Sequence, residues 1–312
     1  MEETIRKIFP EHLRQAFGEC EGTEKLEEIR IRIKQPMIFR TGDGEYFLDE
    51  GKRKFTRNRE LAYCAGKEDL EQMLLFLSRY SIYAFEEEIR RGYITLEGGH
   101  RVGLAGQVVM EEGKVKTIRY INFMNIRVAR EKKGCAQNML PYLYQGDSIY
   151  NTLIVSPPGM GKTTYLRDTV RLLSDGNRER NGLRVCIIDE RSEIAACHLG
   201  VPQNDVGIRT DVMDGCEKAE GMLMVLRAMS PQVIAVDELG GRRDFEAVEK
   251  VLYCGSRILG TVHAENVDEL KRKPSLSDWT GKHMIERFVV LKRTGDGRRL
   301  FEIYDGSLKQ IC

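Results

Sequence analysis

The sequence lacks three features that would each place it in a particular class of protein: a long hydrophobic run, paired cysteines and a large net charge. No stretch approaches the 18 consecutive apolar residues of a membrane-spanning helix. The eight cysteines are scattered, with no C-x-x-C pair and no metal-like spacing to the five histidines. This argues against a metal site built from cysteine and histidine. Because the first residues are charged and include no apolar signal core, we expect a reduced, cytoplasmic chain.

The net charge of +1 gives no overall field that would attract nucleic acid or an anionic membrane. We therefore expect no nucleic-acid partner from bulk charge, although a local basic face is compatible with this composition. Contact with a membrane is expected only through partner proteins.

The 312 residues suffice for two domains on the usual size range. In residues 26–34, LEEIRIRIK, apolar and charged residues alternate with the period of a half-buried strand, and further strands are expected at 101–110 and 114–121. Together with helices at 3–18 and 67–79, they predict a mixed α+β domain over residues 1–132. The polar segment 131–138 is expected to be the hinge.

From residue 133 onward, predicted strands alternate with predicted helices. This pattern is typical of a parallel sheet with helices on both faces. The expected strands are 152–155, 184–188, 233–236 and 257–262, the expected helices are 162–174, 215–229 and 245–254, and two antiparallel strands follow at 288–292 and 299–304. We expect an α/β domain over residues 133–312.

A Gly-rich turn joins a predicted buried strand to a predicted helix in NTLIVSPPGMGKTTYLRD, residues 151–168. This context, with the pattern G-x-x-x-x-G-K-[ST], is typical of a phosphate-binding loop, here called the P-loop. One departure is Ser156 at the first glycine position. Lys162 is expected to reach the β- and γ-phosphates, and Thr163 to bind Mg²⁺. The nucleotide-binding residues expected are Ser156, Pro157, Pro158, Gly159, Met160, Gly161, Lys162, Thr163 and Thr164.

A second apolar strand, VIAVDE at 233–238, ends in two acids. In P-loop proteins an acid at a strand end fixes Mg²⁺, and a following Glu polarises the attacking water. We therefore expect Asp237 to bind the metal together with Thr163, and Glu238 to act on water.

Two more strand ends are expected at the same crevice, since parallel strands bring their carboxyl ends to one edge of a sheet. VCIIDERSE, 185–193, contributes Asp189, Glu190 and Glu193, although a solvated acidic loop or a helix cap explains any one of them equally well. RILGTVHAE, 257–265, ends in His263, whose imidazole could sense the γ-phosphate.

ATP hydrolysis is the activity that these residues favour. No N-K-x-D sequence is present to read guanine, and a Glu directly after the metal-binding Asp suits water activation better than transfer to an acceptor. Two alternatives stay open. One is a RecA-like ATPase or helicase that depends on nucleic acid, and the other is a nucleotide-gated assembly scaffold with little turnover.

The order of the four segments resembles that of the type II and type IV secretion-superfamily ATPases: a phosphate loop, an acidic "Asp box", a second acidic strand and a "His box", here GTVH at 260–263. With EEIRIRIKQP, HRVGLAGQV and NIRVARE in the first domain, the whole chain resembles the branch of this superfamily that acts in spore formation. The resemblance implies a RecA-like P-loop NTPase motor domain with a smaller mixed α+β N-terminal domain, and ATP and Mg²⁺ as cofactors.

The resemblance also implies an assembly and a place in the cell. We expect a homo-oligomeric ring, a hexamer, in the mother-cell cytoplasm. It would energise the channel complex between mother cell and forespore, with the integral membrane proteins of that complex as partners.

N-terminal arginines of the family reach the nucleotide phosphates, and by position Arg101, Arg119 and Arg127 resemble them. A solvated strand face explains each of the three equally well. Many relatives have Gly at the position of Asp237, so the division of labour among the acids stays open. Cys₄ zinc insertions of some relatives are absent, and no metal other than Mg²⁺ is expected.

Overall fold

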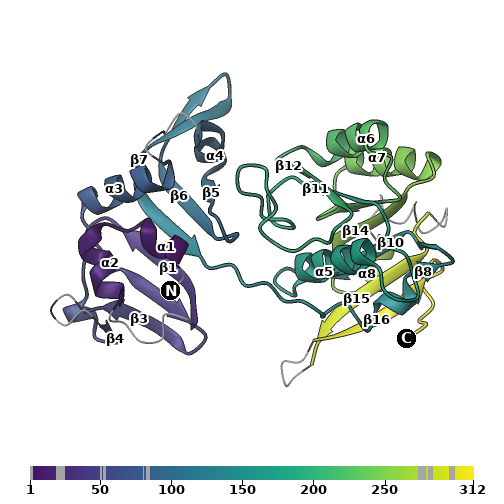
Figure 1. The fold of residues 1–312 in the computed structure, drawn as a ribbon, viewed down its shortest axis with the longest axis horizontal. Coiled ribbons are helices and arrows are strands. Elements are labelled where there is room, and N and C mark those ends of the chain that lie inside the picture. The colour runs from purple at the N-terminus through teal and green to yellow at the C-terminus, as the bar shows by residue number, and fades with distance from the viewer. Residues whose placement is uncertain are drawn as a thin grey trace. The chain divides into compact units, whose positions relative to one another are not determined.

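The computed structural model describes residues 3–18, 25–49, 51, 54–79, 81, 85–272, 279, 284–294 and 299–312. The chain divides into two compact units, Met1–Arg130 and Glu131–Cys312 (Figure 1). Within this described part, no helix combines the length and the apolar composition needed to cross a membrane.

Unit 1 is built on an antiparallel sheet with the strand order β4-β3-β2-β1-β7-β6-β5. The alternating pattern explains the central strand, because Ile29 and Ile31 are fully buried while Arg30 between them is exposed. The strands are β1 (Leu26–Arg32), β2 (Ile38–Thr41), β3 (Gly44–Leu48), β4 (Phe55–Thr56), β5 (Tyr93–Thr95), β6 (Arg101–Glu111) and β7 (Lys114–Arg127). The corresponding strand was predicted to end at residue 121, but β7 continues to Arg127. Tyr120, within this strand, has a left-handed backbone conformation.

Short helices supply the rest of the core of unit 1. Ile5, Leu13, Met73 and Ile89 are each at most 3% exposed and cluster with the buried face of the sheet. The helices are α1 (Glu3–Lys7), α2 (Glu11–Gly18), α3 (Lys67–Leu77) and α4 (Glu86–Arg91), with a 3₁₀ turn, η2 (Arg59–Leu61). Pro10 separates α1 from α2, as its missing N–H requires. The mixed α+β organisation agrees with the prediction.

Unit 2 contains a sheet in the order β12-β11-β13-β14-β10-β15-β16, parallel except for β16. Strands β10, β11 and β13 are buried along their whole length, as expected of a sheet covered on both faces. The strands are β10 (Thr152–Ser156), β11 (Val185–Asp189), β12 (Thr210–Asp214), β13 (Val233–Val236), β14 (Arg257–His263), β15 (Arg287–Arg293) and β16 (Arg299–Asp305).

Helices of unit 2 pack on both faces of this sheet. Leu166 and Val170 of α5 belong to one hydrophobic cluster, whereas Met222 of α6 and Val248 of α7 belong to another on the opposite face. The helices are α5 (Lys162–Asp175), α6 (Lys218–Ala228), α7 (Arg242–Tyr253) and α8 (Val267–Arg272). A 3₁₀ turn, η4 (Leu140–Tyr142), and a small hairpin of β8 (Tyr144–Gln145) and β9 (Ser148–Ile149) precede β10.

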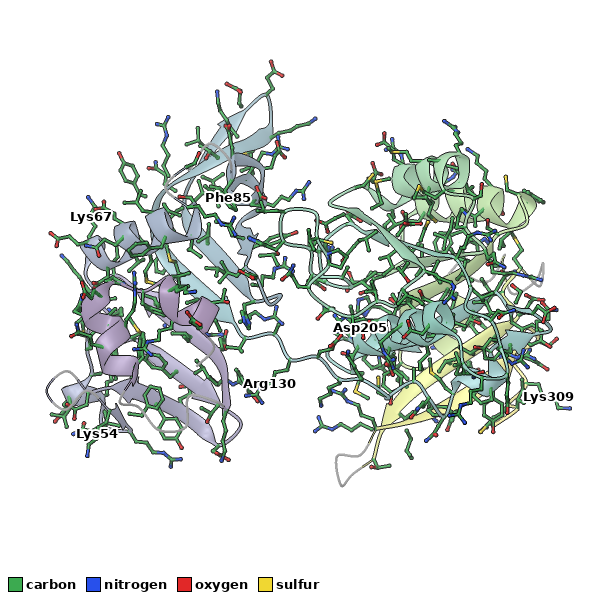
Figure 2. All side chains as sticks on the ribbon, viewed as in Figure 1. Lys54, Lys67, Phe85, Arg130, Asp205 and Lys309 are labelled. Carbon is green, nitrogen blue, oxygen red and sulfur yellow. The ribbon has the colours of Figure 1, made fainter. Side chains whose placement is uncertain are left out.

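The segment expected to be a hinge, residues 131–138, is hydrogen-bonded to the rest of unit 2. Ala136 is fully buried in unit 2, and its N–H donates to the carboxylate of Asp168 on α5 (2.8 Å). Lys133 also contacts this unit through Asp205, labelled in Figure 2, with 2.6 Å between Nζ and Oδ2. Residues 133–138 are therefore anchored to the helix that follows the P-loop, and the sequence missed this because the anchoring carboxylate is distant in the chain.

Asp168 gives a prediction about stability. Its carboxylate is 2% exposed and accepts two hydrogen bonds from the Arg171 guanidinium (2.7 and 3.1 Å). Replacing Asp168 with Asn should lower the free energy of unfolding by about 3 kcal/mol at pH 7, because the half-buried Arg171 loses its closer ionic partner and keeps the more distant Asp175, at 3.7 Å. The measurement is denaturant unfolding of both forms.

The pH dependence of this loss has a definite sign. Burial alone would raise the pKa of Asp168, but the Ala136 N–H and the Arg171 guanidinium outweigh it and hold that pKa below its ordinary value of 3.8. The stabilisation is therefore present above pH 3.8 and is lost as the pH falls through the folded-state value. Asp268→Asn, in an exposed i,i+3 pair with Lys271, is the matched control and should change stability by less than about 0.5 kcal/mol. An equal effect of the two substitutions would contradict the prediction.

Candidate active site

The P-loop connects the end of β10 to the start of α5. Gly159 and Gly161 have φ angles of 77° and 96°, the left-handed region in which a side chain is strained. Ser156, in contrast, is the last residue of β10 and pairs with His263 of β14. Since that position is extended strand, it does not require glycine, and the departure from the usual pattern has a structural reason.

The ammonium group of Lys162 lies inside the loop. Its side chain is 5% exposed, and Nζ donates to the carbonyl oxygens of Ser156 (2.9 Å) and Pro157 (3.1 Å). Nζ also lies 2.9 Å from Nδ1 of His263. The charge is thus held at the centre of the loop, beside the N-terminus of α5.

Asp237 follows β13 and is hydrogen-bonded by two threonine hydroxyls. Thr163 at the start of α5 donates to one carboxylate oxygen, and Thr261 of β14 donates to the other. A hydroxyl and a carboxylate side by side are oxygen donors of the kind that Mg²⁺ prefers, and they leave its other positions to water and phosphate. Thr163 and Asp237 therefore fit the ion that the sequence predicts.

Glu238 has a strained backbone and a fixed side chain. Its φ is 56°, and its N–H donates to Thr261 Oγ1 (2.8 Å). Oε1 lies 3.0 Å from His263 Nε2, and Oε2 lies 2.8 Å from an Arg191 guanidinium nitrogen. Burial alone would raise the pKa of Glu238, but the His263 hydrogen bond and the charges of Arg191 and Lys162 hold it below its usual range. The carboxylate is ionised at neutral pH.

His263 connects the two groups just described. Because Lys162 is a cation that only donates and the Glu238 carboxylate only accepts, Nδ1 accepts from Lys162 while Nε2 carries the proton and donates to Glu238. The ring therefore links the cation expected to bind phosphate to the carboxylate expected to act on water.

The acids of the Asp box, residues 188–193, have two different tasks. Asp189 is 2% exposed, and its oxygens accept the N–H groups of Glu193, Ile194 and Ala195 (2.8 to 3.0 Å), which fixes the loop after β11. Burial raises the pKa of Asp189 to about 6, although the three hydrogen bonds act in the opposite direction and lower it. Its role in this structure is to hold the loop.

Glu190 and Glu193, in contrast, line a small cleft together with Asp237 and Glu238. Glu190 forms an ion pair with Lys218 at the start of α6. The structure thus brings the predicted acids of β11 and β13 to one place, at the edge that also holds the P-loop.

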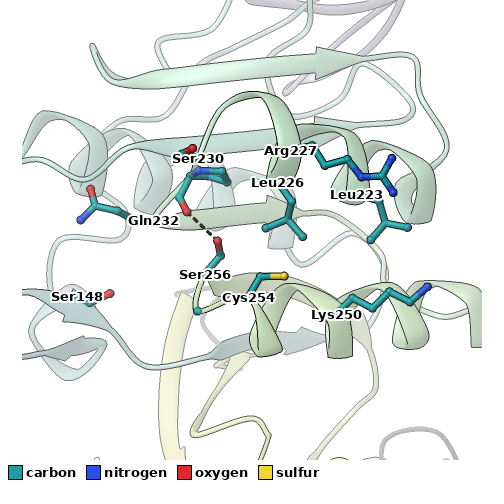
Figure 3. Close-up of a pocket in the computed structure, with 11 residues that line it drawn as sticks. Ser148, Leu223, Leu226, Arg227, Ser230, Gln232, Lys250, Cys254 and Ser256 are labelled. Atoms are coloured by element: carbon teal, nitrogen blue, oxygen red, sulfur yellow. Dashed lines mark hydrogen bonds between the residues drawn. The ribbon is translucent and has the colours of Figure 1, made fainter.

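A cavity of about 650 Å³ in unit 2 lies elsewhere (Figure 3). It is formed where α6 and α7 end and where β13 and β14 begin, so it is at the opposite edge of the sheet from Asp237 and His263. Its lining includes Leu226, Arg227 and Lys250. No predicted site residue lines it, and it is not part of the candidate active site.

The three N-terminal arginines lie in unit 1 and fall into two groups. Arg101 and Arg127 face each other across β6 and β7, and the Arg101 guanidinium carbon lies 3.6 Å from the centre of the Tyr93 ring. Arg119 instead pairs with Gln107, six positions along β6 from Arg101, or about 20 Å at ~3.3 Å per residue. Their contact with the nucleotide stays a prediction.

Several residues of the site were missed by the sequence analysis. Arg191 and Lys218 pair with the acids Glu238 and Glu190, and Thr261 holds both Asp237 and the Glu238 N–H. Arg191 and Thr261 lie within segments that were recognised, but only the strand register shows which side chains meet. Lys218 carried no local signal.

Solved structures show which fold this chain shares. The chain superposes on the X-ray structure of the Legionella pneumophila ATPase DotB with a TM-score of 0.57 at 17% identity, covering 95% of this chain and 78% of that one. For the pilus retraction motor PilT with bound ADP, the TM-score is 0.61 at 16% identity, covering 97% and 82%. The fold is that of the type II/IV secretion ATPases: a RecA-like P-loop NTPase domain with a smaller α+β N-terminal domain.

The chain belongs to the stage III sporulation AA family. The family model described as "Sporulation stage III, protein AA" matches residues 1–311. "Stage III sporulation protein AA" of Bacillus subtilis (strain 168) is 41% identical over 304 residues, which cover 96% of this chain and 94% of that protein. The resemblance seen in the sequence is confirmed.

Proposed function

We propose that this protein is an Mg²⁺-dependent ATPase whose hydrolysis drives a motor ring. The observation that supports this most directly is the connected chain Lys162–His263–Glu238, next to the Thr163–Asp237 pair. A phosphate-binding cation, a metal-binding pair and an ionised carboxylate at one strand edge are the groups that ATP hydrolysis requires.

Each side chain has a separate task in the proposed reaction. Lys162 binds the β- and γ-phosphates in place of the loop carbonyls, and Thr163 and Asp237 hold Mg²⁺, which offsets phosphate charge when bound. Glu238 orients the attacking water and accepts its proton. His263 releases Lys162 when the phosphates bind while keeping Glu238 in position, so it can report whether the γ-phosphate is present.

The biological setting is proposed from the family. The ring, a hexamer, would act in the mother-cell cytoplasm on integral membrane proteins of the channel complex between mother cell and forespore. Arg101, Arg119 or Arg127 of unit 1 would complete the site from the same or a neighbouring copy, so turnover would depend on assembly.

The test is the ATPase rate per molecule as a function of protein concentration, with Glu238→Gln as the control for contaminating activity. We expect the specific rate to rise with concentration, because sites completed between copies are missing in the monomer. A rate per molecule that is constant over a thousandfold range of protein concentration would contradict the proposal that the active form is a ring. ATP turnover that appears only with added DNA or RNA would favour the alternative of a RecA-like ATPase or helicase that depends on nucleic acid.

A further inference from the structure

The edge of the sheet that carries the P-loop continues on the other side of β10, and two arginines lie there. Strand β15 runs parallel to β10, with Val155 paired to Val290, and β16 returns beside it with Arg299 opposite Arg293. In the strand order, β14 and β13 flank β10 on one side and β15 and β16 on the other (Figure 1). The acids and His263 thus occupy one flank of the P-loop, and this arginine pair occupies the other.

Arg299 is in direct contact with the P-loop. Its Nη1 lies 2.9 Å, and its Cζ 3.2 Å, from the point where a β-carbon on Gly161 would stand. Gly161 is the N-cap residue of α5 and has φ of 96°, so the absence of a side chain there makes room for the guanidinium. The arginine is exposed, and it is held beside the first turn of α5.

Positive charges gather on this flank of the P-loop. Two arginines stand directly opposite each other on neighbouring strands, which costs stability. Arg299 also lies beside the N-terminus of α5, which is itself partly positive. An electron-rich aromatic ring or an anion placed between these groups and solvent would relieve the repulsion.

The direction of a bound nucleotide follows from the side chains of the loop. Lys162, Asp237 and Glu238 are the groups suited to the γ-phosphate, and they lie on the β13 and β14 side. A triphosphate with its γ end there leaves its nucleoside end to the other flank, where Arg299 lies. This step rests on the function proposed above.

We propose that Arg299 binds the nucleoside end of ATP by stacking its guanidinium plane on the purine ring. Arginine suits this task because its guanidinium is planar, permanently charged and attracted to aromatic faces. The residue would therefore contribute to the affinity for ATP and ADP without contributing to the recognition of the phosphates.

The test compares the full-length protein with Arg299→Ala by isothermal titration calorimetry, using Mg-ADP and inorganic tripolyphosphate as separate ligands. We expect the Kd for ADP to rise about tenfold, equivalent to about 1.4 kcal/mol, and the Kd for tripolyphosphate to stay within twofold. Arg299→Lys should lose nearly as much ADP affinity as Ala, because lysine keeps the charge but not the plane. Arg178→Ala, an exposed arginine beyond the other end of α5, is the matched control and should change neither Kd.

Other outcomes are equally decisive. If Arg299→Ala weakens the binding of ADP and of tripolyphosphate equally, Arg299 contacts phosphate and the proposal is overturned. The same conclusion follows if Arg299→Lys binds ADP as tightly as the wild-type protein. An unchanged Kd for ADP in Arg299→Ala would overturn it as well. A wild-type protein that binds neither ligand would instead refute the proposed function itself, so the two failures are distinguishable.

Discussion

Lys162→Ala is expected to abolish nucleotide binding and turnover. The ammonium group lies at the centre of the P-loop, and its charge-assisted hydrogen bonds to phosphate would be lost together. A loss of about 4 kcal/mol raises the Kd for ATP roughly a thousandfold. The measurement is calorimetric binding of ATP and ADP, together with the ATPase rate.

Folding is not expected to limit this variant. The substitution removes a nearly buried charge, and the loop carbonyls of Ser156 and Pro157 can be solvated from the open site. Lys250→Ala removes a lysine from the cavity at the opposite edge of the sheet and serves as the matched control, with wild-type affinity expected. Full turnover by Lys162→Ala would show that the P-loop is not the site of hydrolysis.

Glu238→Gln should separate binding from hydrolysis. The amide keeps the shape of the side chain and can still accept a hydrogen bond from His263, but it cannot take a proton from water. We expect kcat to fall by a factor of about 10² to 10⁴, the usual contribution of a general base, while the Kd for ATP changes less than threefold. Single-turnover measurements with saturating enzyme report the chemical step directly.

A neighbouring acid provides the comparison for this substitution. Glu190→Gln removes a carboxylate from the same cleft, where it pairs with Lys218 rather than with the His263 chain. Its kcat should fall by less than tenfold. If the two variants lose activity equally, the assignment of water activation to Glu238 is wrong and the acids act as a group.

Much of unit 2 could be predicted because its signals are local. Strand, Gly-rich turn and helix are contiguous at residues 151–168, and each strand with an acidic or histidine end is an apolar run that the structure confirms as buried. Strand β12 was missed since TDVMD, at residues 210–214, mixes acids with apolar residues at an exposed sheet edge.

The site itself was predictable only in part. Sequence order placed Asp237, Glu238 and His263 at strand ends, but the contact of His263 with Lys162 depends on the pairing of β14 beside β10. Arg299 had no local signal at all, because only the pairing of β15 with β10 and of β16 with β15 brings it to Gly161. Asp189 was expected at the same crevice as Asp237, with a role in capping the loop as the alternative, and its hydrogen bonds to three backbone N–H groups distinguish it from Asp237.

The carbonyl oxygens around Lys162 have a consequence for the turnover cycle. A loop whose cation is already coordinated by its own backbone does not leave a bare charge behind when ADP departs. Part of the gain from binding a phosphate is therefore offset by the bonds that Lys162 gives up, which weakens ATP and ADP alike. The same exchange lowers the barrier to emptying the site. The motor proposed above would have to release its product on every stroke, and a loop whose own carbonyls take the place of the phosphate favours that release.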